Sequence, residues 1–303
     1  MITRYVQRNL TWIDCLSPTA AEVRSLMHEF DIDPLIAEEL LLPSYKPKVE
    51  KLGDLIYIIL HFPTLRNGRQ TPEQEIDFII GKHFLITTRY ENIDPFHTFA
   101  KIFEVEALLK KEAHATHGGH LFVALVRNLY QAIENGCTTM HRRLRDIEER
   151  IFSGDERRMV AGLSQVGRSI HDFRQSMAPH EEMLKSFEPV GTKTFGSEFA
   201  YYVRDLEGAY ERIDRTLDNL HGSLTELRET NNSLLSTKQN EIMKTFTVMA
   251  FIFLPLSFIA GLFGMNTRNN PIVGTAHDFW IIVGIMTVLA CCFFIYFRRK
   301  DWL

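Results

Sequence analysis

Small and polar side chains recur on one face of an apolar segment near the end of the chain. The stripe comprises Thr247, Ala250, Leu254, Ser257 and Gly261, and the opposite face is bulkier and less polar. Such a face could line a hydrated pore, with one stripe from each subunit of a ring. The same residues could instead allow two helices to pack closely in lipid. A path formed by two apolar segments per chain requires several copies of the chain.

Three histidines, His114, His117 and His120, surround a Gly-Gly pair and offer imidazoles of the kind that zinc accepts. An exposed linker between two domains explains the pattern without a metal, and we expect this second interpretation. The sequence contains no P-loop, nucleophile elbow or HExxH motif. We therefore expect neither an enzyme nor an organic cofactor.

Two long uncharged segments lie at the C-terminal end. Residues 246–263 and 279–297 comprise 18 and 19 residues without a charge. Each is long enough to cross the hydrocarbon core of a bilayer, about 30 Å thick. The pattern predicts two transmembrane helices joined by a loop over 264–278.

Basic residues flank this pair of segments on one side. Lys238 and Lys244 precede the first segment, and the tail after the second is basic, whereas the loop offers only Arg268, offset by Asp278. Positive charge stays on the cytoplasmic side. We expect a multi-pass protein of the plasma (inner) membrane with both termini in the cytoplasm.

A heptad pattern precedes the first apolar segment without a break. Its seam comprises Phe199, Val203, Leu206, Tyr210, Ile213, Leu217, Leu220, Leu224, Leu227, Asn231 and Leu234. The 4, 3 alternation is typical of a coiled coil and predicts one helix from about 196 to 263. The seam could pack on helices of the same chain, but this length favours self-association.

The rest of the chain is predicted as a mixed α/β domain followed by a helical hairpin. Ser17-Pro18 and Asp33-Pro34 indicate helix starts, and residues 55–62, 75–80 and 84–88 read as strands, the last two joined at Gly81. Leu121, Leu125, Leu129, Leu144, Ile147 and Ile151 predict the first hairpin helix. The second should run from about 156 to 187, ending near Pro189, after a break at Gly154-Asp155.

Charge and cysteine content exclude several classes. The formal net charge is −4, and the segment before residue 246 carries an excess of acidic residues, which argues against nucleic acid as a partner. None of the four cysteines forms a CxxC pair, so a disulfide framework or a structural zinc site is not expected.

The first apolar segment ends in Gly264-Met265-Asn266, and here the chain resembles the CorA family of divalent-cation channels. The signature of that family is a Gly-Met-Asn tripeptide at the end of the first of two C-terminal spans. Further matching stretches are residues 46–50, 240–244, 253–261 and 298–303. The similarity extends over essentially the whole chain.

The resemblance implies a homopentameric funnel, with an α/β cytoplasmic N-terminal domain, a long stalk helix and two transmembrane helices per chain. The expected regions are 1–118 (α/β domain), 119–190 (hairpin), 191–245 (stalk), 246–263 (pore-lining span), 264–278 (external loop), 279–297 (second span) and 298–303 (basic tail). The partners would be the bilayer and divalent cations.

The resemblance also assigns roles to residues. Gly264, Met265 and Asn266 would form the external mouth, where five amide carbonyls hydrogen-bond the water shell that Mg²⁺ gives up reluctantly. The expected pore and gate residues are Asn240, Met243, Phe246, Thr247, Ala250, Leu254, Ser257 and Gly261, with Leu254 as the hydrophobic constriction. Arg298, Arg299 and Lys300 would form a basic ring, and Asp205 and Glu229 a regulatory site for intracellular Mg²⁺. The resemblance also implies that the N-terminal domain supplies a partner carboxylate to this regulatory site. Leu65 and Arg66 stand near the expected position, and the carboxylates beyond them are Glu73, Glu75 and Asp77.

Two positions depart from the family pattern. Phe263 stands where the family has tyrosine, and Arg268 occupies a loop in which an acidic residue is usual. A ring of arginines would repel cations. From the resemblance as a whole, the prediction is a channel for Mg²⁺, with Co²⁺ or Ni²⁺ as further ions. The alternatives are a proton-coupled Zn²⁺ transporter and a non-conducting, membrane-anchored coiled-coil sensor.

Overall fold

The chain forms two compact units, Met1–Arg228 and Glu229–Leu303. The computed structural model describes residues 1–44, 46–63, 65–66, 69–70, 73–91, 94–108, 116–265, 277–300 and 302. Asn266 and Arg268 at the expected mouth, and His114, lie outside these residues.

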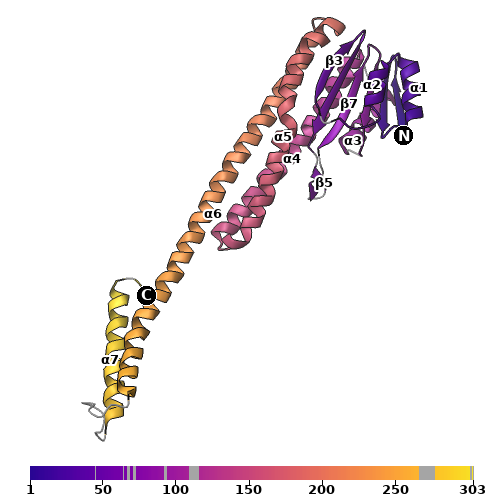
Figure 1. Ribbon diagram of the computed structural model, residues 1–303. Coiled ribbons are helices and arrows are strands. Elements are labelled where there is room, and N and C mark those ends of the chain that lie inside the picture. Colours follow the sequence, from indigo (N-terminus) through magenta and orange to yellow (C-terminus); the bar gives the residue numbers. More distant parts are fainter. Residues whose placement is uncertain are drawn as a thin grey trace. The chain divides into compact units, whose positions relative to one another are not determined.

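The first unit contains a sheet with helices packed beside it (Figure 1). The sheet has six strands in the order β1-β2-β8-β7-β4-β3. Its strands are β1 (Ile2–Gln7), β2 (Leu10–Leu16), β3 (Lys48–Leu52), β4 (Leu55–Phe62), β7 (Gln74–Ile80) and β8 (Phe84–Arg89). Neighbouring strands are antiparallel except for the parallel pair β2 and β8. A separate small ribbon comprises β5 (Leu65–Arg66) and β6 (Arg69–Gln70).

The three predicted strands and the turn at Gly81 are confirmed, but β1, β2 and β3 were not predicted. Helices cover both faces of the sheet at β2, so most of its residues are buried and the alternation that marks a half-buried strand is lost.

Helices cover both faces of the sheet. Helices α1 (Ala20–Phe30) and α2 (Pro34–Glu39) share one core with Ile13, Tyr57, Ile59 and Ile79. Helix α3 (Asp94–Leu108) packs on the other face, where the rings of Trp12 and Phe99 lie 5.1 Å apart. On that same face, the rings of Phe78 and Phe122 lie 5.1 Å apart, which places the helical hairpin beside α3.

The predicted start of the first helix is wrong by two residues. Thr19, not Ser17, is the N-cap: its hydroxyl accepts a hydrogen bond from the Glu22 N–H, and the Glu22 carboxylate accepts one from the Thr19 N–H at 2.8 Å. Ser17 instead donates its hydroxyl to the Tyr90 carbonyl at 3.0 Å. The predicted cap at Asp33 is confirmed, since its carboxylate accepts from the Leu35 N–H.

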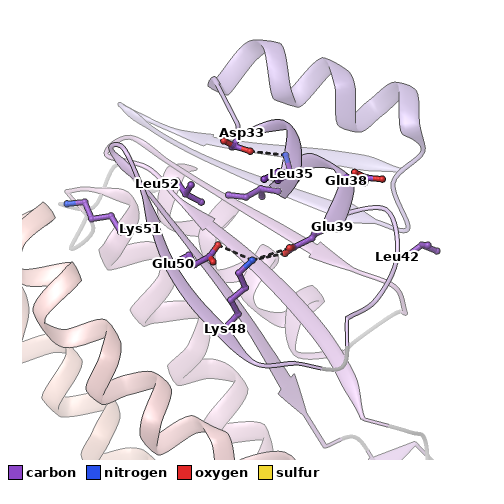
Figure 2. Close-up of a pocket in the computed structure, with 10 residues that line it drawn as sticks. Asp33, Leu35, Glu38, Glu39, Leu42, Lys48, Glu50, Lys51 and Leu52 are labelled. Atoms are coloured by element: carbon purple, nitrogen blue, oxygen red, sulfur yellow. Dashed lines mark hydrogen bonds and ion pairs between the residues drawn. The ribbon is translucent and has the colours of Figure 1, made fainter.

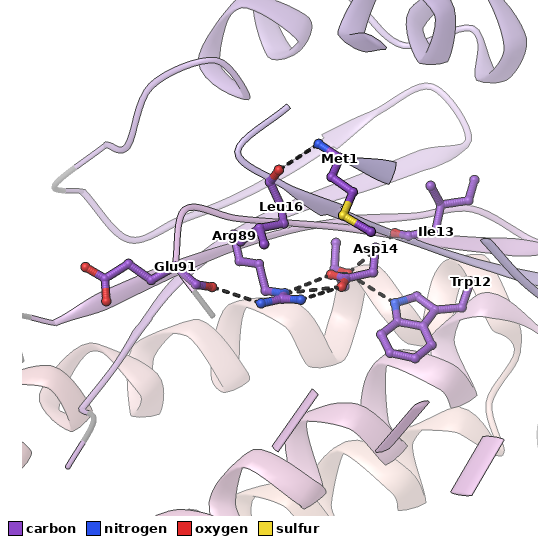
Figure 3. A network of polar contacts seen from close by, with 8 residues as sticks. Met1, Trp12, Ile13, Asp14, Leu16, Arg89 and Glu91 are labelled. Carbon is purple, nitrogen blue, oxygen red and sulfur yellow. Dashed lines mark hydrogen bonds and ion pairs between the residues drawn. The ribbon is translucent and has the colours of Figure 1, made fainter. Parts of the chain in front are cut away.

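A buried ion pair ties β2 to β8 (Figure 3). The Arg89 guanidinium donates to Asp14 at 2.8 Å, and both side chains are less than a tenth exposed. Thr87 donates to the same carboxylate and accepts a hydrogen bond from the Trp12 indole. The charges are thus both paired and hydrogen-bonded, as burial requires.

Two long helices form the predicted hairpin, α4 (Gly118–Phe152) and α5 (Glu156–Phe195). The break at Gly154-Asp155 and the buried positions of the first helix are confirmed. The predicted end near Pro189 is wrong, because α5 contains both Pro179 and Pro189 and ends at Phe195.

Helix α6 (Phe199–Gly264) is one continuous helix of 66 residues. Its seam is buried from Phe199 to Leu227 within the single chain. The Phe199 ring contacts Phe187 of α5, and Leu224 lies next to Gly167 of α5. Packing on the chain's own helices, rather than self-association, therefore accounts for this part of the seam.

Candidate ion pathway

The second unit contains two apolar helices side by side, the C-terminal part of α6 and α7 (Asp278–Arg299) (Figure 1). Their most apolar windows have mean hydropathies of 2.3 and 2.4, and almost none of those residues are buried by the chain. A core helix of a soluble protein would be covered. These surfaces therefore require lipid or further copies of the chain.

Helix α7 covers one face of α6. Val248 is buried, and Ile252, Ile259 and Phe263 are half-buried at the helical spacing that follows it. The Phe251 and Phe297 rings lie 6.2 Å apart across the two helices. This covered face is bulky and apolar.

The predicted pore stripe lies on the opposite, uncovered side of α6, as the helical period places it. Leu254 is 69% exposed, Ala250, Ser257 and Gly261 are exposed, and Thr247 is half-buried. Asn240, Met243 and Phe246, at the expected entrance, are exposed as well. Within one chain, the structure therefore leaves the stripe free for contact with something else.

Two oxygen atoms along the apolar part of α6 keep lone pairs for another donor. The Thr247 hydroxyl donates to the Met243 carbonyl at 2.8 Å, so its oxygen can still accept. Pro255 has no N–H, so the Phe251 carbonyl lacks its usual helical partner. Thr247 belongs to the stripe and is an acceptor suited to a hydrated cation, whereas the Phe251 ring lies toward α7.

Gly261 and Gly264, near the end of α6, lie in open surroundings within the described part of the chain. Among the described residues, no atom lies within 4 Å of where a Cβ would stand on Gly261 or Gly264. Gly264 is the last residue of α6, and Met265 follows it, exposed. The absence of side chains here thus leaves room for a second helix or for an ion with its water.

The basic residues occupy the other end of α7. Arg298 and Arg299 lie in its last turn, and the Lys300 ammonium lies 5.7 Å from the Tyr296 ring centre. Trp302 stacks on Phe297 with ring centres 6.0 Å apart. Aromatic and basic residues together are typical of a helix end at a membrane interface.

The predicted regulatory residues are not brought together within one chain. Asp205 forms an ion pair with Arg127 of α4. Glu229 is exposed and lies 24 residues further along α6, about 36 Å at 1.5 Å per residue. In the described part of the chain, no three His, Cys, Asp or Glu side chains converge as metal ligands do.

Two of the carboxylates considered as partners in the N-terminal domain are already committed to other contacts. Glu75 accepts from the Ser44 N–H at 2.7 Å and lies 3.1 Å from His61. Asp77 is buried and accepts from the Tyr90 hydroxyl at 3.2 Å. Burial raises the pKa of Asp77, and the Glu75 charge raises it further. Neither carboxylate reaches the surface as a ligand for an ion.

The expectation of an exposed histidine linker is wrong. His117 and His120 are half-buried and stack on each other with ring centres 3.9 Å apart, and His117 also stacks on Phe195. Burial lowers the pKa of His117 to about 4. Stacked rings do not direct their in-plane nitrogens at one ion, so this pair acts as an aromatic contact.

A groove of about 660 Å³ between α2 and β3 was not predicted (Figure 2). Lys48 projects into it and pairs with Glu39 at 3.1 Å and Glu50 at 2.9 Å. The ammonium is thus shared between two carboxylates, and the group links α2 to β3.

Comparison with known proteins decides the family. The model of the CorA-like Mg²⁺ transporter protein family matches residues 7–299. The chain belongs to the CorA-like family. The predicted fold class is confirmed: an α/β N-terminal domain, a long helix and two C-terminal apolar helices.

Similar CorA proteins cover nearly the whole chain. The cobalt/magnesium transport protein CorA of Thermotoga maritima is 25% identical over 299 residues, which span 97% of this chain and 83% of that protein. The structure of the CorA magnesium transporter from Methanocaldococcus jannaschii has a TM-score of 0.84 at 20% identity, covering 97% of this chain and 92% of the other.

Zinc transporters of the same fold are also similar. The zinc transport protein ZntB of Photorhabdus laumondii is 24% identical over 86% of this chain and 78% of its own length. The ZntB cytoplasmic domain of Vibrio parahaemolyticus has a TM-score of 0.63 at 12% identity, covering 78% of this chain and 91% of that one. This CorA-like chain is thus a membrane protein of a divalent-cation transporter family.

Proposed function

We propose that this chain forms a homopentameric Mg²⁺ channel of the inner membrane, with both termini in the cytoplasm. The observation that carries the proposal is the stripe from Thr247 to Gly261, which α7 leaves uncovered. A ring of subunits that turn these stripes inward encloses a polar path and places their bulkier faces against α7 and lipid. The number five comes from the family resemblance.

The ion follows from the chemistry of the mouth. Gly264, Met265 and Asn266 offer neutral oxygens, which hold a hydrated Mg²⁺ without stripping its water. Weak binding lets the ion leave again. Inward movement of a divalent cation gains about 4.6 kcal/mol per 100 mV, twice the value for a single charge. Co²⁺ and Ni²⁺ are further candidate ions.

A second candidate function is proton-coupled Zn²⁺ transport. It is favoured by the similarity to ZntB proteins over most of the chain and by Arg268 in the loop, whose charge opposes the approach of cations. The Gly-Met-Asn tripeptide supports Mg²⁺ as the principal ion.

Flux into liposomes separates these functions. The purified protein is reconstituted, and Mg²⁺ and Zn²⁺ entry are followed with a membrane potential or a pH gradient imposed. We expect potential-driven Mg²⁺ entry that Asn266→Ala abolishes and that Asn232→Ala, a change at an exposed α6 position away from the stripe, preserves. Zinc entry that follows the pH gradient would transfer the protein to the second function. No flux of either ion would favour the membrane-anchored sensor.

A further inference from the structure

A second polar site lies in the first unit, between α5 and α6. The groove measures about 600 Å³ and is lined by Gly167, His171, Arg174, Gln175, His221, Leu224 and Arg228. These side chains include two guanidiniums, two imidazoles and a carboxamide, all of which can donate hydrogen bonds. No carboxylate is among the lining residues, although the chain as a whole is acidic.

Arg228 differs from the other arginines of α6. Arg204 pairs with Glu188 at 3.0 Å, Arg212 with Glu134 at 3.8 Å and Arg215 with Glu211 at 3.1 Å. Among the described residues, no carboxylate oxygen lies within 4.0 Å of the Arg228 guanidinium. The positive charge of Arg228 is therefore left for a ligand, while Arg174 is shared with Asp218 at 3.0 Å.

Gly167 of α5 determines where the Arg228 guanidinium lies. A Cβ on Gly167 would overlap with Nη2 of Arg228 and would come within 3.1 Å of the Leu224 side chain. The missing side chain lets the guanidinium reach across from α6 onto α5. The α5 backbone at Gly167 thus fixes the position of the Arg228 guanidinium on one side of the groove.

The flank of α6 nearer its start has the opposite character. Burial and neighbouring carboxylates raise the pKa of Glu207 and of Asp214. Asp214 interacts with Asp218 and with Arg174, so these carboxylates border the Arg174 end of the groove, and an anion is favoured at the Arg228 end. His221 and Arg228 lie seven positions apart on α6, about 10 Å along the helix, so the donors extend along the groove.

We propose that this groove binds a phosphate-bearing anion. A guanidinium presents a planar fork of N–H donors that matches phosphate oxygens, and the imidazoles and Gln175 supply further donors along the groove. The ligand is a free phosphate-bearing anion or the phosphate of a lipid headgroup. This inference does not depend on which ion the pore conducts.

Calorimetric titration of the full chain tests the proposal, with sodium tripolyphosphate as the probe in metal-free buffer. The protein is held in nanodiscs of neutral phosphatidylcholine. We expect saturable binding at one site per chain, weakened at least tenfold in Arg228→Gln and in Gly167→Ala. Arg215→Gln removes another exposed charge on α6, outside the groove, and should bind as the parent does.

Two results would overturn the inference: no binding of the probe by the parent, and equal weakening by Arg215→Gln. If the parent binds no probe and Arg228→Gln also loses chain assembly, the groove is assigned to carboxylates of another copy. Nanodiscs of phosphatidylglycerol distinguish the two sources. If phosphatidylglycerol weakens the binding of tripolyphosphate, the site takes headgroup phosphate. If the binding of tripolyphosphate is undiminished, the ligand is a free anion. Arg228→Lys, which keeps the charge, controls for folding and should retain part of the affinity.

Discussion

Leu254 is the residue that we expect to form the hydrophobic gate of the pore. Its side chain is 69% exposed in one chain and stands in the middle of the uncovered stripe. In a ring, five such side chains form a hydrophobic constriction that closes by dewetting. Leu254→Ser should let water remain and increase Mg²⁺ entry several-fold. Val288→Ser, at an exposed position of α7, should leave the flux unchanged, and equal effects of both would contradict the gate.

The buried pair of Asp14 and Arg89 gives a prediction for stability. Arg89→Met leaves the Asp14 carboxylate buried without its partner, which typically costs about 3 to 5 kcal/mol. The matched double variant, Asp14→Leu with Arg89→Met, removes both charges and should recover most of the loss. Thermal unfolding followed by circular dichroism checks both. A double variant as unstable as the single one would show that packing, not charge, dominates.

Individual residues also show what the sequence alone could reveal. The stripe was predictable because helical spacing places its members on one face, and the uncovered side of α6 is where they lie. Ser17 precedes proline, a pattern that favours a helix cap, but Thr19 has the partner at Glu22 that completes the capping box. The role of Arg228 was not predictable, since it depends on a glycine in another helix.

His117, the residue directly before α4, should make the stability of the fold depend on pH. Burial, and then His120, lower the pKa of His117 from 6.5 to about 4. The unfolded chain therefore takes up this proton first, and the free energy of unfolding should fall as the pH drops from about 6.5 to about 4. His180, buried and with its pKa lowered to about 4, acts in the same direction. His117→Phe keeps the stack on Phe195 and should lose less stability over this range, as chemical denaturation at several pH values would show.

An ion pair between Arg127 of α4 and Asp205 of α6 involves a residue of the predicted regulatory site. The resemblance predicts closure by intracellular Mg²⁺ at Asp205, and Arg127 occupies that carboxylate. Arg127→Ala should free it, so that a several-fold lower cytoplasmic Mg²⁺ concentration closes the channel. Arg212→Ala, which breaks another pair between the same helices, is the control. Patch-clamp recording with varied cytoplasmic Mg²⁺ measures both, and unchanged inhibition in Arg127→Ala would argue against regulation at Asp205.

Elements with a strong period were predicted better than elements set by their neighbours. The hairpin and α6 follow from regular apolar spacing, whereas β2 is buried on both sides and reads as neither strand nor helix. The heptad seam was periodic enough to predict a helix but not its partner. The partner proved to be α4 and α5, because hairpin and seam come from the same chain and pack without the entropy cost of association.

At the scale of the whole molecule, the proposal requires several chains. Native mass spectrometry of the protein released from detergent should give five times the 35.2 kDa mass of one chain. Gly261→Leu should weaken the assembly, because a large side chain fills space that one chain leaves open. Gly284→Leu, at a glycine of α7 with equally open surroundings, is the control. A monomer or dimer that still conducts would contradict the ring.

The hydrogen bond from Thr247 to the Met243 carbonyl also has a consequence for biogenesis. In hydrocarbon, a hydroxyl with no acceptor would be penalised, and a newly inserted subunit would be driven to find a partner at once. Thr247 satisfies its donor within its own helix, as Thr245 does toward Glu241. The Thr247 hydroxyl therefore does not by itself drive a solitary subunit toward a partner, whereas the Phe251 carbonyl, which Pro255 leaves without its helical N–H, does. Assembly would then depend on that carbonyl and on the fit of surfaces, and its rate on how many subunits the membrane holds.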